Sequence, residues 1–118
     1  MLPLPLRPIS TERPFQQWGL DFIGEIHPPS SGQHRWIITA TDYFTKWIET
    51  IPCRQANDSV IIGFLETYIL SIFGCPEKII TDNVAAFKSK RIISFCNKYH
   101  ITLGHSTAYY PQGNGLAE

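Results

Sequence analysis

The stretch Gln17-Trp18-Gly19-Leu20-Asp21-Phe22-Ile23-Gly24-Glu25-Ile26 decides how the chain folds. Its apolar residues are as dense as in a strand that is buried on both faces, and Asp21 stands among them. A buried carboxylate is costly unless something pairs with it. No Lys or Arg occurs between Arg13 and Arg35, so no basic partner is close in sequence. A divalent cation shared with acids farther along the chain would offset the cost; the plainer alternative is that Asp21 lies at a strand end and faces water.

The composition indicates one domain with no net charge. The 118 residues are enough for a single core, and ten basic against ten acidic residues give zero formal net charge. Neutrality argues against tight autonomous binding of nucleic acid, which depends on neutralising phosphates. Three widely spaced cysteines predict small apolar core residues rather than disulfides or a zinc site. No apolar run is long enough to cross a membrane.

Short strands dominate the first half of the chain. Residues 1–14 are rich in proline and predict an extended linker that leads into a core formed by residues 15–118. Apolar, β-branched segments at 18–26, 36–41 and 47–51 are joined by short turns. They predict three strands in an antiparallel meander.

The apolar pattern then changes to helical spacing. A helix is predicted from Asp58 to Phe73, ended by Gly74 and Pro76, and is followed by a strand at 78–81. A second helix from about Ser89 and a fifth strand at 100–103 complete an α/β domain with a mixed five-stranded sheet. The crossover helix makes the fourth strand parallel to a neighbour, which we expect to be the first.

Three acids then come from three separate elements of this predicted fold. Asp21 lies in the first strand, Asp82 at the carboxyl end of the fourth, and Glu118 where a last helix would open. Hard cations take oxygen ligands, and two ions about 3.5–4 Å apart can hold the attacking and leaving oxygens of a phosphoryl transfer. For Asp82, the plain alternative is an Asx turn after a strand. Asp42 is also acidic, but it suits the hairpin turn.

Several motifs, taken in order, resemble the catalytic core of retroviral-type integrases. They are Trp-Gly-Leu-Asp-Phe-Ile-Gly around Asp21, Ile-Thr-Asp-Asn at 80–83, and Tyr-Pro-Gln-Gly-Asn-Gly-Leu-Ala-Glu at 110–118. Arg13-Pro14-Phe15 and the segment 42–47 resemble more specifically the integrases of gypsy-type long-terminal-repeat retrotransposons. The resemblance covers about residues 13–118.

This resemblance implies a ribonuclease H-like fold and an aspartate–aspartate–glutamate site. Asp21, Asp82 and Glu118 would be catalytic and would hold two Mg²⁺ or Mn²⁺ ions. The implied reactions are trimming of DNA 3′ ends and their transfer to target DNA, which implies DNA as partner, a nuclear location and a possible homodimer. The residues implied to contact DNA are Asn83, Tyr110, Pro111, Gln112, Asn114 and Gly115.

The chain departs from the family pattern at two places. Val84 stands where the family commonly has Gly, and a β-branched residue would be strained if the turn needs positive φ. Glu118 is the last residue, so we expect the final helix to be missing. We therefore expect a C-terminally truncated core that encodes integrase chemistry but performs it weakly or not at all.

Two alternative functions remain open from the sequence. One is a non-catalytic remnant that serves as an interaction module. The other is a ribonuclease H-type nuclease, in which Glu66 on the first helix would be a metal ligand. The basic run Lys88, Lys90 and Arg91 could contact DNA phosphates or simply face solvent.

Overall fold

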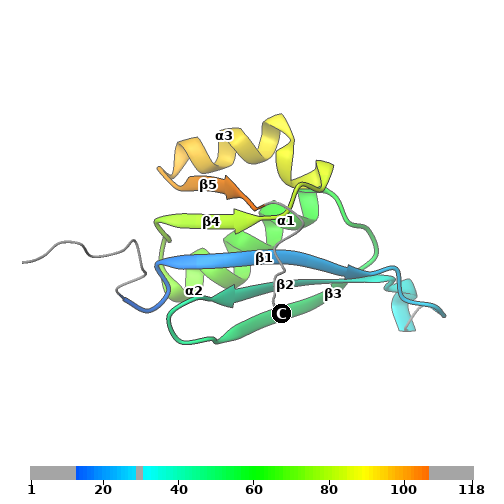
Figure 1. Cartoon of the computed structure of the whole chain (residues 1–118). Coiled ribbons are helices and arrows are strands. Elements are labelled where there is room, and N and C mark those ends of the chain that lie inside the picture. The colour runs from blue at the N-terminus through cyan, green and yellow to red at the C-terminus, as the bar shows by residue number, and fades with distance from the viewer. Residues whose placement is uncertain (1–12, 29–30, 107–118) are drawn as a thin grey trace, which may run out of the picture.

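A mixed five-stranded sheet forms the centre of the computed structural model, which describes residues 13–28 and 31–106 (Figure 1). The strand order across the sheet is β3-β2-β1-β4-β5. The strands are β1 (Gln17–Gly24), β2 (Trp36–Asp42), β3 (Ile48–Cys53), β4 (Lys78–Thr81) and β5 (Thr102–His105). The α-helices are α1 (Asp58–Phe64), α2 (Ser71–Phe73) and α3 (Lys90–Lys98), with the π-helical segment Leu65–Leu70 and short 3₁₀ turns at Ser31–Gln33 and Ala85–Lys88.

The strand pairing confirms the predicted mixed sheet. β2 pairs antiparallel with both β1 and β3, whereas β4 pairs parallel with both β1 and β5. Two strand boundaries differ slightly from the predictions. β1 ends at Gly24 rather than at Ile26. β5 lies at Thr102–His105 rather than at 100–103.

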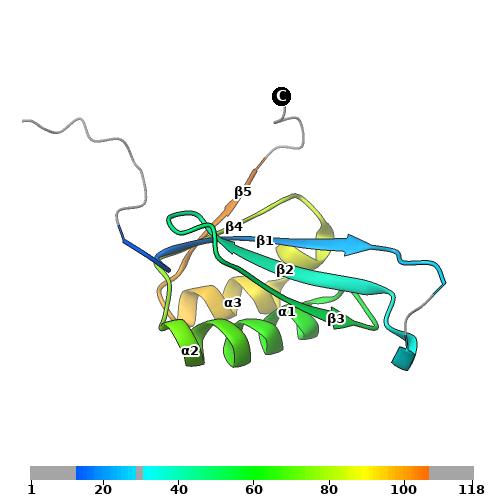
Figure 2. The ribbon, with the colours of Figure 1, turned by 90° about the horizontal axis from the view of Figure 1, so that it is seen from below.

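All three α-helices cover the same face of the sheet (Figure 2). Asn57 is the N-cap of α1, and its side chain accepts a hydrogen bond from the Val60 N–H at 3.0 Å. Helical structure continues through the π-helical segment to Gly74, where φ of 90° ends it. The predicted helix between Asp58 and Phe73 is therefore present, with a π-helical middle.

The core lies between the sheet and these helices. β1 contributes Trp18 and Leu20 and β2 contributes Ile38 and Ala40, all fully or almost fully buried. They pack with apolar residues of the helices and of β4, namely Ile61, Phe64, Leu65, Ile69, Ile79, Phe87, Ile92 and Phe95. Side chains at alternate positions of each strand point to the opposite face.

The prediction that β1 is buried on both faces is wrong. Trp18 and Leu20 are buried toward the helices, but Asp21 is an exposed residue on a strand whose accessibility alternates. Since no helix of the described residues covers that second face, Asp21 lies at an open side of the sheet. The plainer alternative is therefore correct in that the Asp21 carboxylate faces water.

Two of the three cysteines occupy the core as predicted. Cys53 and Cys96 are buried, whereas Cys75 is exposed, which corrects its assignment as a core residue. All three are free thiols. Within residues 13–28 and 31–106, no helix has the length and apolarity that a membrane crossing would need.

Candidate active site

The pairing register of β1 and β4 brings Asp21 and Asp82 together. Trp18 pairs with Ile79 and Gly19 with Ile80, so the same parallel register, continued by two residues, sets Asp21 opposite Asp82. Their carboxyl groups are within hydrogen-bonding reach of each other. Two acids far apart in sequence thus meet where β4 ends, which is where ligand-binding groups collect in open α/β sheets.

The electrostatics of this pair disfavour two negative charges. Partial burial raises the pKa of Asp21, and the nearby charge of Asp82 and a hydrogen bond between the two side chains raise it further. A hydrogen bond from the Phe22 backbone acts in the opposite direction but does not cancel these effects. A pair of carboxylates held this close gains from any positive charge placed between them.

A hollow of about 250 Å³ lies over this pair. Polar groups make up much of its wall. The lining residues come from β1, β2 and β4 and from the positions directly after β2, β4 and β5: Asp21, Thr39, Thr41, Tyr43, Thr81, Asp82 and Ser106, with Gly19, Leu20 and Ile80. Gly19 leaves room for the Tyr43 ring, because a Cβ atom there would come within 3.0 Å of it. The hollow is thus open and polar, as a site for a charged substrate requires.

A local turn fixes the Asp82 side chain. Its Oδ1 accepts a hydrogen bond from the Val84 N–H at 3.0 Å, so Asp82 does form the Asx turn that was the plain alternative for this residue. A carboxylate has further acceptor capacity, so the turn and a ligand role are compatible. Val84 has φ of −63° and ψ of 139°, so the expected strain from a β-branched residue in place of glycine is absent.

The donor set at this site suits a hard cation. Two carboxylates side by side, one with a raised pKa, are oxygen ligands of the kind that Mg²⁺ and Mn²⁺ prefer. Within the described ranges, no three His, Cys, Asp or Glu side chains are grouped so that they could hold a metal ion. Glu118, the third predicted ligand, lies outside the described residues.

Glu66 does not join the two aspartates. It is exposed within the π-helical segment Leu65–Leu70 and belongs to no group of three potential ligands with Asp21 and Asp82. Because the ribonuclease alternative needs a carboxylate from this helix at the site, the geometry gives that alternative no support.

The predicted DNA contacts fall partly within the structure. Asn83 is exposed directly after Asp82. The other five residues implied to contact DNA, Tyr110, Pro111, Gln112, Asn114 and Gly115, lie outside the described residues.

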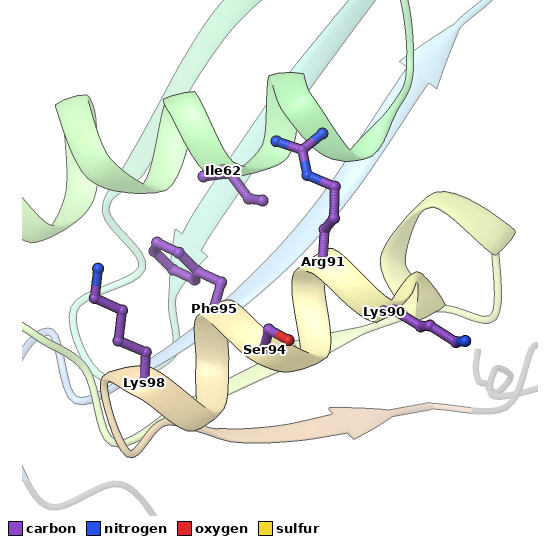
Figure 3. Close-up of a pocket in the computed structure, with 6 residues that line it drawn as sticks. All are labelled: Ile62, Lys90, Arg91, Ser94, Phe95 and Lys98. Carbon is purple, nitrogen blue, oxygen red and sulfur yellow. The ribbon is translucent and has the colours of Figure 1, made fainter.

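The basic run after β4 belongs to a different surface. Arg91 extends toward α1, where its Nη1 lies 3.1 Å from Asp58 Oδ1 and 2.7 Å from Ser59 Oγ. A second hollow of about 350 Å³ lies there between α1 and α3, with Ile62 and Phe95 as apolar lining and Lys90, Arg91 and Lys98 around them (Figure 3). Among the described residues no carboxylate lines it, and none of its lining residues also lines the hollow over the aspartate pair.

Three residues beside Asp82 were not predicted from the sequence. Thr81 is buried, and both His105 and Ser106 make hydrogen bonds to it across β5. Thr81 falls within the Ile-Thr-Asp-Asn motif, but no role was assigned to it there, and no motif marks His105 or Ser106. The pairing register of β4 with β5, in which Thr81 faces His105, is the only signal that identifies them, and it needs the correct end of β5.

Comparison with known proteins gives matches over nearly the whole chain. The sequence profile of the integrase core domain family matches residues 11–111. The Gag-Pol polyprotein of avian reticuloendotheliosis virus is 30% identical over 105 residues, which are 89% of this chain and 9% of that protein. The Pro-Pol polyprotein of simian foamy virus type 3 is 30% identical over 113 residues, 96% of this chain and 10% of that protein. The chain therefore spans about a tenth of the length of these curated relatives.

Solved structures show the same fold. The catalytic core domain of HTLV-2 integrase in complex with magnesium, in a trimeric form, superposes with a TM-score of 0.66 at 26% identity. The match covers 79% of this chain and 60% of that one. The mixed five-stranded sheet with helices is thus the ribonuclease H-like architecture predicted from the sequence.

Proposed function

Because the chain belongs to the integrase core domain family, we propose that it is the catalytic core of an integrase of a gypsy-type retrotransposon. The proposed reaction is metal-dependent trimming of DNA 3′ ends followed by transfer of those ends to target DNA. The observation that carries this proposal is the Asp21–Asp82 pair, brought together by the parallel register of β1 and β4 within a polar hollow.

Asp21, Asp82 and Glu118 would hold two Mg²⁺ or Mn²⁺ ions. When bound, divalent cations lower the pKa of an attacking water or 3′-hydroxyl and neutralise charge on the phosphodiester in the transition state. Of these carboxylates, the parallel pairing of β1 and β4 holds Asp21 and Asp82 side by side before any ion arrives. Magnesium in the HTLV-2 integrase core, a relative at 26% identity, supports this choice of cation.

The rest of the hollow would receive the DNA backbone. Its Thr39 and Thr41 hydroxyls can donate hydrogen bonds to phosphate oxygens, and Asn83 is exposed directly after Asp82. We place Tyr110, Pro111, Gln112, Asn114 and Gly115 at the same substrate by family resemblance. Since the formal net charge of the chain is zero, we expect weak DNA binding. The reaction on chromosomal target DNA would take place in the nucleus.

A titration of the 118-residue chain with Mg²⁺ tests the metal site. Amide resonances of Asp21, Asp82 and their neighbours should shift at millimolar metal in the wild type and should not shift in Asp21→Asn or Asp82→Asn. Glu49→Gln, which changes an acid of β3 outside the hollow, serves as the matched control and should respond as the wild type does. A wild-type spectrum without any response at these residues would contradict the proposal.

A strand-transfer assay tests whether the chain performs the reaction. The readout is joining of a labelled DNA 3′ end to a plasmid in the presence of Mn²⁺. Metal binding together with joining that Asp82→Asn abolishes supports the catalytic core. Metal binding without any joining by the same chain would favour the non-catalytic module instead.

We also propose that the chain forms a homodimer. Tyr68 and Ile72, on the π-helical segment and α2, are exposed apolar residues, with Ile72 60% exposed. A twofold contact centred on the hollow between α1 and α3 is unfavourable, because it would bring the cations of two copies together. Ile72→Asp should therefore lower the mass measured by sedimentation, whereas Ile93→Asp, on α3, should not; equal masses for the wild type and Ile72→Asp would contradict this surface.

A further inference from the structure

His105 makes a side-chain contact to the strand that ends in Asp82. The parallel register of β4 and β5 pairs Thr81 with His105, at the last residue of each strand. The His105 Nδ1 atom lies 2.8 Å from Thr81 Oγ1 and 3.3 Å from the backbone carbonyl oxygen of Asp82. One ring nitrogen is therefore directed at both residues.

The Thr81 hydroxyl determines which nitrogen of His105 carries the proton. Thr81 is 2% exposed, and its Oγ1 lies 3.0 Å from the Asp82 carbonyl oxygen, to which it donates. A hydroxyl has a single proton, and a carbonyl oxygen can only accept. All three contacts are satisfied together only if Nδ1 carries a hydrogen, because an unprotonated Nδ1 would turn its lone pair toward the Asp82 carbonyl.

Ser106 holds the preceding peptide group, which joins Thr81 to Asp82. Its backbone N–H donates to the Thr81 carbonyl oxygen at 2.7 Å, and its hydroxyl lies 3.3 Å from that oxygen. The carbonyl groups of Thr81 and Asp82 are thus both fixed by residues at the end of β5. Together with the bond from the Val84 N–H to Asp82 Oδ1, these contacts leave the Asp82 side chain little freedom to turn away from Asp21.

We propose that His105 is a positioning residue for Asp82. Its Nδ1–H group, together with the Thr81 hydroxyl, holds the Asp82 main chain so that the carboxylate faces Asp21. This inference deepens the proposed function and rests on it for the consequence in metal binding. The His105 Nδ1 atom points to the hydroxyl and the carbonyl rather than into the carboxylate pair, and among the described residues His105 belongs to no group of three potential metal ligands.

The geometry predicts a tautomer that can be measured without metal. A long-range ¹⁵N–¹H spectrum of the full chain at pH 8 should show the proton of His105 on Nδ1. A proton on Nε2 would overturn the inference, whatever the metal-binding properties of the chain are. This measurement does not depend on the proposed function.

Three substitutions separate positioning from general structural support. Asn has its amide nitrogen at the same number of bonds from the backbone as Nδ1, so His105→Asn keeps the donor. Gln carries its amide one bond farther out, and Ala has no donor. We expect His105→Ala and His105→Gln to weaken Mg²⁺ affinity, read from the Asp21 and Asp82 amide shifts, by about tenfold, as for other outer partners of metal ligands. His105→Asn should stay within about twofold of the wild type.

Controls keep the result interpretable. His105 is exposed, so none of the three variants should lose the fold, which their thermal midpoints will show. His100→Asn is a matched substitution away from the site, at a residue whose φ of 58° suits Asn, and should leave Mg²⁺ affinity unchanged. If the wild type binds Mg²⁺ and His105→Ala binds it equally well, the positioning role is refuted. If the wild type fails to bind Mg²⁺, the proposed function is refuted. The tautomer of His105 then still shows whether its Nδ1–H contacts Thr81 and Asp82 as proposed.

Discussion

The backbone N–H of Phe15 donates a hydrogen bond to Asp42 Oδ1 at 2.9 Å, across 27 positions of sequence. Asp42 is fully buried, and its Oδ2 accepts from the Thr45 N–H at 2.8 Å and from the Thr45 hydroxyl at 2.6 Å. One carboxylate thus ties the segment that precedes β1 to the turn between β2 and β3. The two motifs that suggested the gypsy-type subgroup, around Phe15 and around Asp42, are therefore parts of one structural unit.

Replacing Asp42 should destabilise the fold strongly. Burial raises the pKa of Asp42, but hydrogen bonds from Thr45, Phe15 and Phe44 outweigh it, so the net pKa lies below the ordinary value. Asp42→Ala removes a buried carboxylate and leaves the donors of these partly buried hydrogen bonds, Phe15 and Thr45, without their acceptor, and we expect the free energy of unfolding at pH 7 to fall by about 3 kcal/mol. Urea denaturation measures this change.

The pH dependence gives a second test of Asp42. Since the folded-state pKa is lowered, the stabilisation is fully present above the unfolded pKa of about 4 and is lost as the pH falls through the lowered value. The difference in unfolding free energy between wild type and Asp42→Ala should therefore shrink below about pH 4. Thr45→Ala, which removes only one donor, should cost less at every pH. An Asp42→Ala protein as stable as Thr45→Ala would contradict this role.

The effect of Asp21 on stability should depend on pH in the opposite direction to that of Asp42. Its folded-state pKa is raised, so folding disfavours the charged form and the penalty is present at neutral pH. As the pH falls through the raised pKa, the folded protein takes up a proton and the penalty disappears. We expect Asp21→Asn to stabilise the metal-free chain at pH 7, by less than about 1 kcal/mol because solvent screens this exposed residue, and to have no stabilising effect near pH 4.

Adding metal should reverse the order of stability of the wild type and Asp21→Asn. Millimolar Mg²⁺ should raise the thermal midpoint of the wild type, since a ligand that binds only the folded state stabilises it, and should leave that of Asp21→Asn unchanged. Such a trade of stability for function is common at active sites. If Asp21→Asn is less stable than the wild type in metal-free buffer at pH 7, the repulsion inferred between Asp21 and Asp82 is wrong.

Much of the fold could be predicted because its signals are local. Gly74 and Pro76 end the first helical segment and Ser89 caps α3, accepting from the Ile92 N–H, all within a few residues of sequence. The parallel pairing of β1 with β4 followed from the crossover between them. The exposure of Asp21 could not be derived in this way, because it depends on which face of the sheet the helices cover, and an apolar run looks the same in either case.

The site was predictable only in part, for a related reason. Asp21 and Asp82 stand out as acids within apolar strands, and topology brings them together. His105 and Ser106 act through the far end of β5, whose position was predicted two residues too early. A shift of that size changes which side chain lies beside Thr81, so no reasoning from residue type alone could assign their contacts.

Gly24 at the end of β1 provides a test of how closely the chain packs around this residue. It has φ of 153°, and a Cβ atom there would come within 2.7 Å of the Trp36 ring and 2.8 Å of the Arg35 carbonyl oxygen. Because the carbonyl belongs to the backbone and cannot move aside, Gly24→Ala should lower the free energy of unfolding by about 2 kcal/mol. Gly63 in α1 has open space around it, and Gly63→Ala should instead stabilise by about 0.5–1 kcal/mol. Equal effects of the two substitutions in urea denaturation would contradict the packing at Gly24.

The three thiols should differ in reactivity because burial separates them. Burial, together with the nearby Cys75, raises the pKa of the Cys96 thiol to about 11, and burial also raises the pKa of Cys53. Cys75 is exposed, although partial burial raises the pKa of its thiol as well. Because the thiolate is the reacting form and the reagent must reach it, we expect a disulfide reagent at pH 8 to modify Cys75 alone in the native chain and all three cysteines in denaturant. Mass spectrometry of the labelled peptides identifies the sites, and Cys75→Ser should abolish the native reaction. Rapid labelling of Cys96 in the folded wild type would mean that α3 does not bury this side chain against the core as the structure indicates.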